Sequence, residues 1–259
     1  MVSFISIIVV VFVWHVITLI GNQFGVKLYD NVQICILISV YLVIKRSNNG
    51  RFRLDFIGMK FKKNSFKQLF IGIGIGMLLY FAWILILSSM KIIKFKGLGF
   101  MLYPANKILI NTVSAFVISI LAALAEEILF RGIVLNQLIQ FKGKIFAIII
   151  SSLIFAMCHF QYYQQFNCLF EVFIMGILYG YLYIITGSLF MSIDVHFAVD
   201  FYLIMSGVSN KLLLFTWKIN NLDVSLYLSY VQIVVTLILI LVLVLYRYKN
   251  RKKGVDIEI

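Results

Sequence analysis

The sequence predicts an all-α fold, a polytopic bundle of transmembrane helices, on three observations. The chain of 259 residues is 63% hydrophobic and only 13% charged, whereas soluble domains are about 45–50% apolar and about 25% charged. Its apolar residues form runs of roughly the 20 residues that a spanning helix needs. Its basic residues gather at the ends of these runs, as they do around membrane helices.

About eight apolar runs are candidates for spans, although the second and the fifth are short. The fourth run is too long for one simple span, so we expect it to be tilted, kinked or partly interfacial. The first run has neither a basic segment before it nor a small-residue cleavage site, so we expect a retained helix. The runs are roughly residues 4–21, 31–45, 67–89, 107–141, 145–160, 168–186, 188–207 and 222–246.

The distribution of basic residues predicts the orientation of the bundle. With eight spans, segments 45–67, 142–144 and 247–253 lie on one side and hold 15 of the 23 Lys and Arg residues. The opposite side holds seven. This excess places both termini in the cytoplasm. The net charge of +13 therefore reflects membrane topology, and no nucleic-acid partner is expected.

Acidic residues inside apolar runs are the first sign of function. A charge near the bilayer centre costs about 2.5–3.5 kcal/mol, so such residues usually face a bundle interior or a wet cavity and have a functional role. Five of the ten acidic residues lie well inside the runs, away from their ends, namely Glu126, Glu127, Glu171, Asp194 and Asp200.

The fourth run contains a glutamate pair followed by an arginine. Glu127 and Arg131 are separated by four residues, so on a helix they share a face and can pair. Glu126 lies about 100° away around the helix and is free to act as a general base. The alternative is that both glutamates only pair with basic groups to fasten helices together.

Two histidines follow on later helices. Phe155 and His159 share one helix face, and so do His196 and Asp200. The second spacing suits an aspartate that orients a histidine, or two groups directed at one substrate oxygen. The structural alternatives are a satisfied histidine at a helix end and an isolated interhelical hydrogen bond.

Three further polar residues are left out of the predicted site. His15 has no acidic neighbour in its run, Asp194 lies about 200° from His196 around the helix, and Glu171 belongs to no recognisable spacing. The glycine pairs 72/76 and 176/180 have the GxxxG spacing and predict close helix packing. With histidine only at positions 15, 159 and 196, the chain has no HExxH zinc motif.

The three polar segments, in this order, resemble the motifs of the CPBP family, which includes CaaX prenyl-protein endopeptidases and bacterial Abi proteins such as bacteriocin self-immunity proteins. The resemblance covers about residues 107–207 and implies an all-helical intramembrane endopeptidase. The residues that carry it are Glu126-Glu127-x-x-x-Arg131, Phe155-x-x-x-His159 and His196-x-x-x-Asp200.

The resemblance also implies residue roles. Glu126 and His159 would activate the hydrolytic water, and His196 with the residue four positions later would stabilise the oxyanion. Glu127, Arg131 and Phe155 would support the site. Asparagine is common in the family where this chain has Asp200. An ionised carboxylate cannot donate a hydrogen bond, so Asp200 is either protonated or orients His196.

The resemblance favours a metal-free, glutamate-dependent mechanism with no cofactor. The alternative is zinc, because Glu126, His159 and His196 would supply three ligands and leave one position open. Three parts of the chain are then expected: N-terminal helices with a basic cytoplasmic loop in 1–106, the catalytic core in 107–207, and a last helix with a basic tail in 208–259.

The resulting prediction is a bacterial, multi-pass cell-membrane protease that cleaves a membrane-associated peptide or protein, with roles such as bacteriocin immunity or peptide maturation. Two other classes stay open. One is a non-catalytic membrane protein that confers immunity or modulates a sensor. The other is a small proton-coupled transporter that uses the buried charges as a relay.

Overall fold

The computed structural model describes residues 58–59, 64–159, 162–206, 214–220 and 223–252. The candidate spans at 4–21 and 31–45 lie outside these residues, and so does His15. The orientation predicted from the basic segments therefore stays a prediction.

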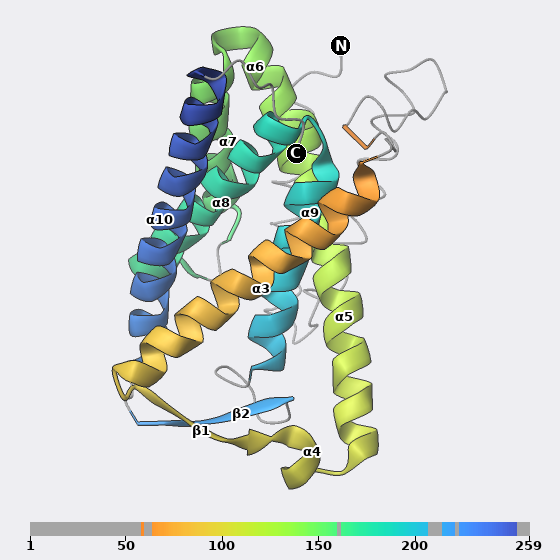
Figure 1. Cartoon of the computed structure of the whole chain (residues 1–259), viewed down its shortest axis with the longest axis vertical. Helices are drawn as coiled ribbons and strands as arrows, with labels where there is room; N and C mark the ends of the chain where they lie inside the picture. Colours follow the sequence, from red (N-terminus) through yellow and green to blue (C-terminus); the bar gives the residue numbers. More distant parts are fainter. Residues whose placement is uncertain (1–57, 60–63, 160–161, 207–213, 221–222, 253–259) are drawn as a thin grey trace, which may run out of the picture.

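The described part is a helical bundle built around α9 (Leu189–Met205). Figure 1 shows α3 (Ser65–Ser89) crossing α9, with α5 (Ala105–Glu127) alongside, and both helices pack directly on α9. The remaining helices form the rest of the bundle and are η2 (Ile128–Leu135), α6 (Asn136–Lys142), α7 (Lys144–Met157), α8 (Phe166–Thr186) and α10 (Val224–Lys252).

Four helices of the described part are long and apolar enough to cross a membrane: Ser65–Ser89, Ala105–Lys142, Phe166–Thr186 and Val224–Asn250. They correspond to four of the predicted runs. Helix α7 has 14 residues and α9 has 17, which is shorter than the roughly 20 residues of a full span. The count of eight spans is therefore not confirmed.

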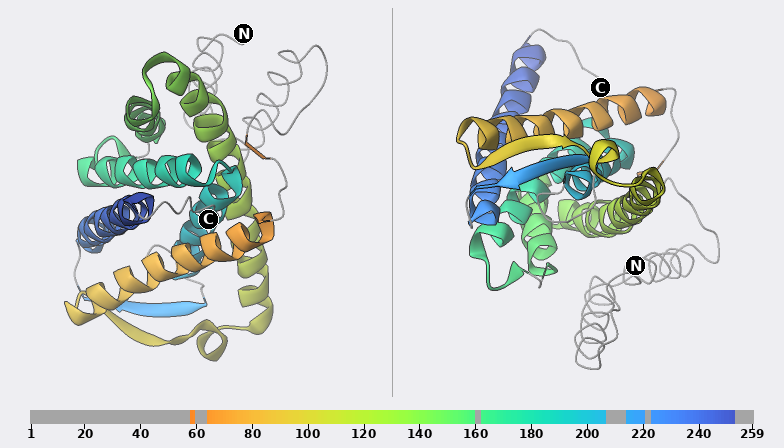
Figure 2. Two further views of the ribbon diagram at one scale, coloured as in Figure 1. Left: turned by 45° about the horizontal axis from the view of Figure 1, so that its top comes forward. Right: turned by 90° about the horizontal axis from the view of Figure 1, so that it is seen from below.

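A small sheet is the part of the fold that the sequence analysis missed. Strand β1 (Ile93–Leu98) pairs antiparallel with β2 (Phe215–Ile219), and a short helix α4 (Gly99–Leu102) follows β1. Figure 2, seen from below, shows the two strands lying across one end of the bundle. The described residues are mostly helical, as the all-α prediction requires. The sequence analysis did not expect these two strands, because they are far apart in the sequence and pair only in the folded chain.

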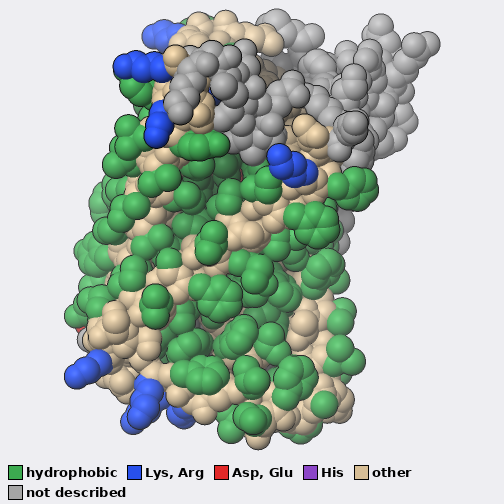
Figure 3. All heavy atoms as spheres, viewed as in Figure 1, with side chains coloured by type: hydrophobic (Ala, Val, Ile, Leu, Met, Phe, Trp, Pro, Cys, Tyr) green, Lys and Arg blue, Asp and Glu red, His purple; other side chains and the backbone are tan. Residues whose placement is uncertain are grey.

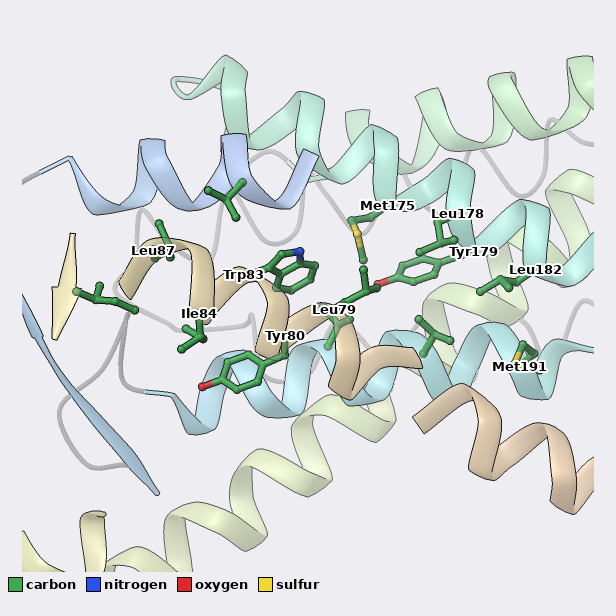
Figure 4. Packing of buried hydrophobic residues seen from close by; sticks show 14 of the residues in the cluster. Leu79, Tyr80, Trp83, Ile84, Leu87, Met175, Leu178, Tyr179, Leu182 and Met191 are labelled. Carbon is green, nitrogen blue, oxygen red and sulfur yellow. The ribbon is translucent and has the colours of Figure 1, made fainter. Parts of the chain in front are cut away.

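The core beneath the sheet joins α3 to α8 and α9. Figure 4 shows Leu79 and Trp83 of α3 facing Met175 and Tyr179 of α8, and all four belong to one buried cluster. Full burial of large apolar side chains such as Trp83 stabilises by about 1.5–3 kcal/mol each in water. Within a bilayer, tight packing takes over this role.

The predicted glycine contacts are confirmed, since these positions let helices approach closely. A Cβ added at Gly72 would lie 2.6 Å from Asp194 Cβ, and one added at Gly76 would lie 2.5 Å from Ala198 Cβ. A Cβ at Gly176 would lie 3.0 Å from Ser152 Cβ of α7. Helix α3 is thereby held against α9, and α8 against α7.

The surface between the two ends of the bundle is apolar. Figure 3 shows hydrophobic side chains over most of the visible face, with Lys and Arg at its upper and lower ends. On α3, Phe66, Phe70, Leu78 and Leu85 are exposed. An exposed apolar area of this extent fits contact with lipid. The chain is thus a helical membrane protein.

Candidate active site

A π-helical segment follows the glutamate pair directly. Residues Ala105–Lys142 run as one apolar helix of 38 residues, and within it η2 covers Ile128–Leu135, all of them buried. Single π-helical turns are rare and are often found at functional sites. The glutamates therefore stand where this long helix changes its hydrogen-bonding pattern.

The ion pair predicted from the spacing is present. Arg131 Nη1 donates to Glu127 Oε1 at 2.8 Å, and both side chains are 0% exposed. Arg131 Nη2 also donates to the carbonyl oxygen of Gly176 at 3.1 Å. Its guanidinium carbon lies 4.4 Å from the centre of the Phe155 ring and 5.3 Å from that of Tyr179. The buried cation thus has a carboxylate, a carbonyl and two aromatic faces around it.

His196 is attached to the same carboxylate. Its Nδ1 lies 2.9 Å from Glu127 Oε1, and its ring stacks on Tyr179 with centroids 4.7 Å apart. The other nitrogen, Nε2, lies 3.8 Å from Glu126 Oε2 and 3.4 Å from Asp200 Oδ2. Glu127 therefore fixes one edge of the ring while the opposite edge faces the remaining polar groups.

His159 lies just after the end of α7. Its Nδ1 is 2.8 Å from the carbonyl oxygen of Phe155. A carbonyl only accepts, so Nδ1 carries the proton, and in the neutral ring Nε2 has the free lone pair. This Nε2 lies 3.8 Å from Glu126 Oε2. Tyr162 lies parallel to the His159 ring at 6.4 Å, and burial raises the pKa of this tyrosine to about 12, so its hydroxyl stays a donor at neutral pH.

Glu126 is the point on which these groups converge. Its Oε2 has no hydrogen-bond partner among the described residues, although the side chain is 19% exposed. Separations of 3.8 Å to two histidine nitrogens are too long for direct hydrogen bonds. They leave room for one water bonded to the carboxylate and to an imidazole.

The structure brings together every residue of the predicted site, both the catalytic and the supporting group. They are Glu126, Glu127, Arg131, Phe155, His159, His196 and Asp200. Asp194 lies against α3 at Gly72, and Glu171 lies on a cavity that it shares with Asp200.

Three contributing residues escaped the sequence reasoning. Tyr179 supports the His196 ring, the carbonyl of Gly176 binds Arg131, and Tyr162 covers His159. The GxxxG spacing indicated packing at Gly176 but not a polar contact. A tyrosine inside an apolar run or a short turn gives no signal of its own.

The three alternative zinc ligands fit the metal in type but not in spacing. In both histidines Nδ1 lies within hydrogen-bond distance of an acceptor, as it does in histidines that bind zinc through Nε2. A tetrahedral zinc shell places donors about 3.3 Å apart, so the 3.8 Å separations would have to shorten by about 0.5 Å. No group of three such side chains in the described residues is close enough to hold a metal as it stands.

Part of the chain is similar to a known protein family. Residues 108–202, from α5 to α9, match the family described as type II CAAX prenyl endopeptidase Rce1-like. The resemblance is confirmed. The matched segment contains all three motifs and agrees with the 107–207 range taken from them.

The chain is also similar to the uncharacterized protein YpbD of Bacillus subtilis (strain 168). It is 34% identical to this chain over 83 residues, which cover 32% of this chain and 40% of that protein. The chain thus spans well under half the length of this relative. No solved structure matches the chain. The match to the CAAX endopeptidase family thus covers the segment that holds the site.

Proposed function

We propose that this protein is an intramembrane endopeptidase that hydrolyses a peptide bond in a membrane-associated protein or peptide. The observation that carries this proposal is the position of Glu126 Oε2, 3.8 Å from Nε2 of both His159 and His196 inside an apolar bundle. The match of residues 108–202 to an endopeptidase family supports it.

The first step is attack by water. A water bonded to Glu126 and to the lone pair of His159 Nε2 gives a proton to the Glu126 carboxylate, and its oxygen bonds to the carbonyl carbon of the substrate. The carbonyl oxygen becomes an oxyanion. Glu126 then gives this proton to the amide nitrogen, the carbon–nitrogen bond breaks, and a carboxylic acid and an amine leave.

In the proposed mechanism, His196 stabilises the oxyanion. In its protonated form it donates from both nitrogens, with Nδ1 directed to Glu127 and Nε2 directed into the site. Oxyanion donors of this kind typically stabilise the transition state by about 2.7–4 kcal/mol. Asp200, at 3.4 Å from Nε2, orients the ring until the substrate arrives.

The setting is a bilayer, so substrates reach the site from the membrane or its surface. We propose a bacterial cell membrane with several spans, and the relative from Bacillus subtilis supports a bacterial source. Bacteriocin immunity and maturation of exported peptides are roles that this chemistry would serve. Nucleic acid is not among the proposed partners.

The test is substrate capture with Glu126→Gln, which keeps the shape of the side chain but removes the base. Cells expressing this variant should accumulate intact peptides on the protein, whereas wild type should release fragments of the same peptides, both identified by mass spectrometry. Equal capture of intact partners by wild type and variant would overturn the protease and favour a non-catalytic binding role. Proton-coupled flux in liposomes that depends on Glu126 would favour a transporter.

A further inference from the structure

A second polar region lies beside the proposed catalytic groups. A cavity of about 380 Å³, open on one side, is lined by α8, α9, α10 and the turn at residues 162–165. Two of its lining residues border the site: Tyr162 lies parallel to the His159 ring, and Asp200 faces His196 at 3.4 Å. A group that fills this cavity is therefore adjacent to a peptide bond positioned at Glu126.

The charge of the cavity is one-sided. Glu171 and Asp200 both line it, and none of the described lining residues is Lys, Arg or His. Asp200 has His196 next to it, whereas no basic side chain of the described residues lies within ion-pair distance of Glu171. An ionised Glu171 in this apolar setting is left without a counter-ion, which a cationic ligand would supply.

The Glu171 carboxylate is held in place by α10. When the Gln232 amide is oriented with its nitrogen toward Glu171, the orientation in which both of its polar atoms have partners, it donates to Oε1 at 2.9 Å and to Oε2 at 3.2 Å. Gln232 and the neighbouring Ser229 are both buried, and Asn167 of α8 donates to Ser229 Oγ at 3.0 Å. This network across α8 and α10 fixes the carboxylate on the cavity wall, and its α10 members lie outside the segment matched by the family.

Most of the remaining wall is apolar. Val172, Leu203, Ile204 and Leu228 line the cavity together with the polar groups. A largely apolar wall that also carries a carboxylate matches an amphipathic side chain with an aliphatic stem and a cationic head. Lysine and arginine are the side chains of this kind.

We propose that this cavity is a substrate subsite for a lysine or arginine side chain, whose head pairs with Glu171 and whose stem packs on Leu203, Ile204 and Leu228. The inference rests on the proposed endopeptidase function, because the cavity adjoins the groups that would cleave the peptide. A neutral side chain in its place leaves the ionised Glu171 carboxylate on the cavity wall without a counter-ion, so the subsite selects against it.

Binding tests the subsite without any cleavage. The full chain carrying Glu126→Gln is placed in nanodiscs and titrated with apolar peptides of about 20 residues, each with a single lysine at a different position, and with matched norleucine peptides. At one position, the lysine peptide should bind at least about tenfold more tightly than its norleucine counterpart. Equal affinities at every position would overturn the proposal.

Variants of Glu171 provide the second measurement. Added to Glu126→Gln, Glu171→Gln should remove the preference for lysine, and Glu171→Lys should reverse it in favour of a glutamate peptide. Asp194→Asn, which removes a carboxylate that is not on the cavity, is the matched control and should keep the preference. A lysine preference that survives Glu171→Gln would also overturn the proposal.

The two proposals fail separately. Cleavage by wild type that requires Glu126 but shows no preference for Lys or Arg at any substrate position would refute the subsite and leave the protease intact. Lysine-dependent binding without hydrolysis by wild type would refute the protease and leave the subsite intact.

Discussion

Two neighbouring glutamates belong to two different polar clusters. In the closed cluster, Glu127, Arg131 and Nδ1 of His196 are joined by contacts of 2.8–2.9 Å, and Glu127 and Arg131 are fully buried. In the open cluster, Glu126, His159, Asp200 and Nε2 of His196 are separated by 3.4–3.8 Å, and the side chains of Glu126, His159 and Asp200 are 18–33% exposed.

The difference shows how one helix supports structure and chemistry at adjacent positions. Short charge-assisted hydrogen bonds fix a side chain, and they leave no space for a reactant. Longer separations at a partly exposed carboxylate admit water and substrate. His196 belongs to both clusters, so the closed cluster orients the ring that the open cluster would use.

The largest effect is expected from breaking the closed cluster. Arg131→Met leaves the Glu127 carboxylate buried with one partner fewer, which should lower the free energy of unfolding by about 3–5 kcal/mol. Thermal unfolding in detergent measures the change, and hydrolysis should be lost with it. The double variant Glu127→Gln/Arg131→Met removes both charges and should recover part of the stability. Equal stability of wild type and Arg131→Met would show that the pair does not hold the bundle.

Local helix geometry explains why this pair was predictable. Glu127 and Arg131 share a face of any helix, so their contact follows from a spacing of four residues. Glu127 and His196 are 69 residues apart in the sequence, and their contact depends on α5 and η2 lying beside α9. Residue spacing within one helix cannot predict a contact between two helices. The meeting of these three segments was expected only from the family resemblance of the three motifs in their order.

The same limit applies to the fold. Runs of apolar residues located the helices, because hydropathy is a local property. The pairing of β1 with β2 is non-local, because it joins segments more than 100 residues apart in the sequence. The cavity at Glu171 was missed for the same reason, since Gln232 of α10 and Asp200 of α9 come from separate runs.

The next effect concerns the open cluster. Glu126→Gln removes the proposed base and should lower kcat/KM by about 10³-fold, within the range for general acid–base groups. Since Oε2 has no partner among the described residues, thermal stability should stay within about 0.5 kcal/mol of wild type. Turnover of a captured peptide and unfolding of the same preparation provide both values. A variant that is inactive because it unfolds would place Glu126 in the closed cluster instead.

Asp200 should have a smaller effect, because its contact with the proposed catalytic groups is with His196 alone among the described residues. Asp200→Asn keeps a polar group at the same place and adds a donor, so kcat/KM should change by less than about tenfold in either direction. Asp200→Leu removes the contact at 3.4 Å and should lower kcat/KM further. If Asn and Leu have the same effect, the side chain does not act through His196.

The smallest effect is expected from metal removal. The open cluster would need donors about 0.5 Å closer together to hold zinc, so the glutamate mechanism predicts a change of less than about twofold in kcat/KM after treatment with a chelator. Elemental analysis of the purified protein, with Glu126→Gln as the matched sample, measures bound zinc directly. If wild type contained one equivalent of zinc and lost both the zinc and its activity on chelation, the open cluster would be a metal centre and the metal-free mechanism would be wrong. Glu127 of the closed cluster would then orient the zinc ligand His196 through its contact with Nδ1.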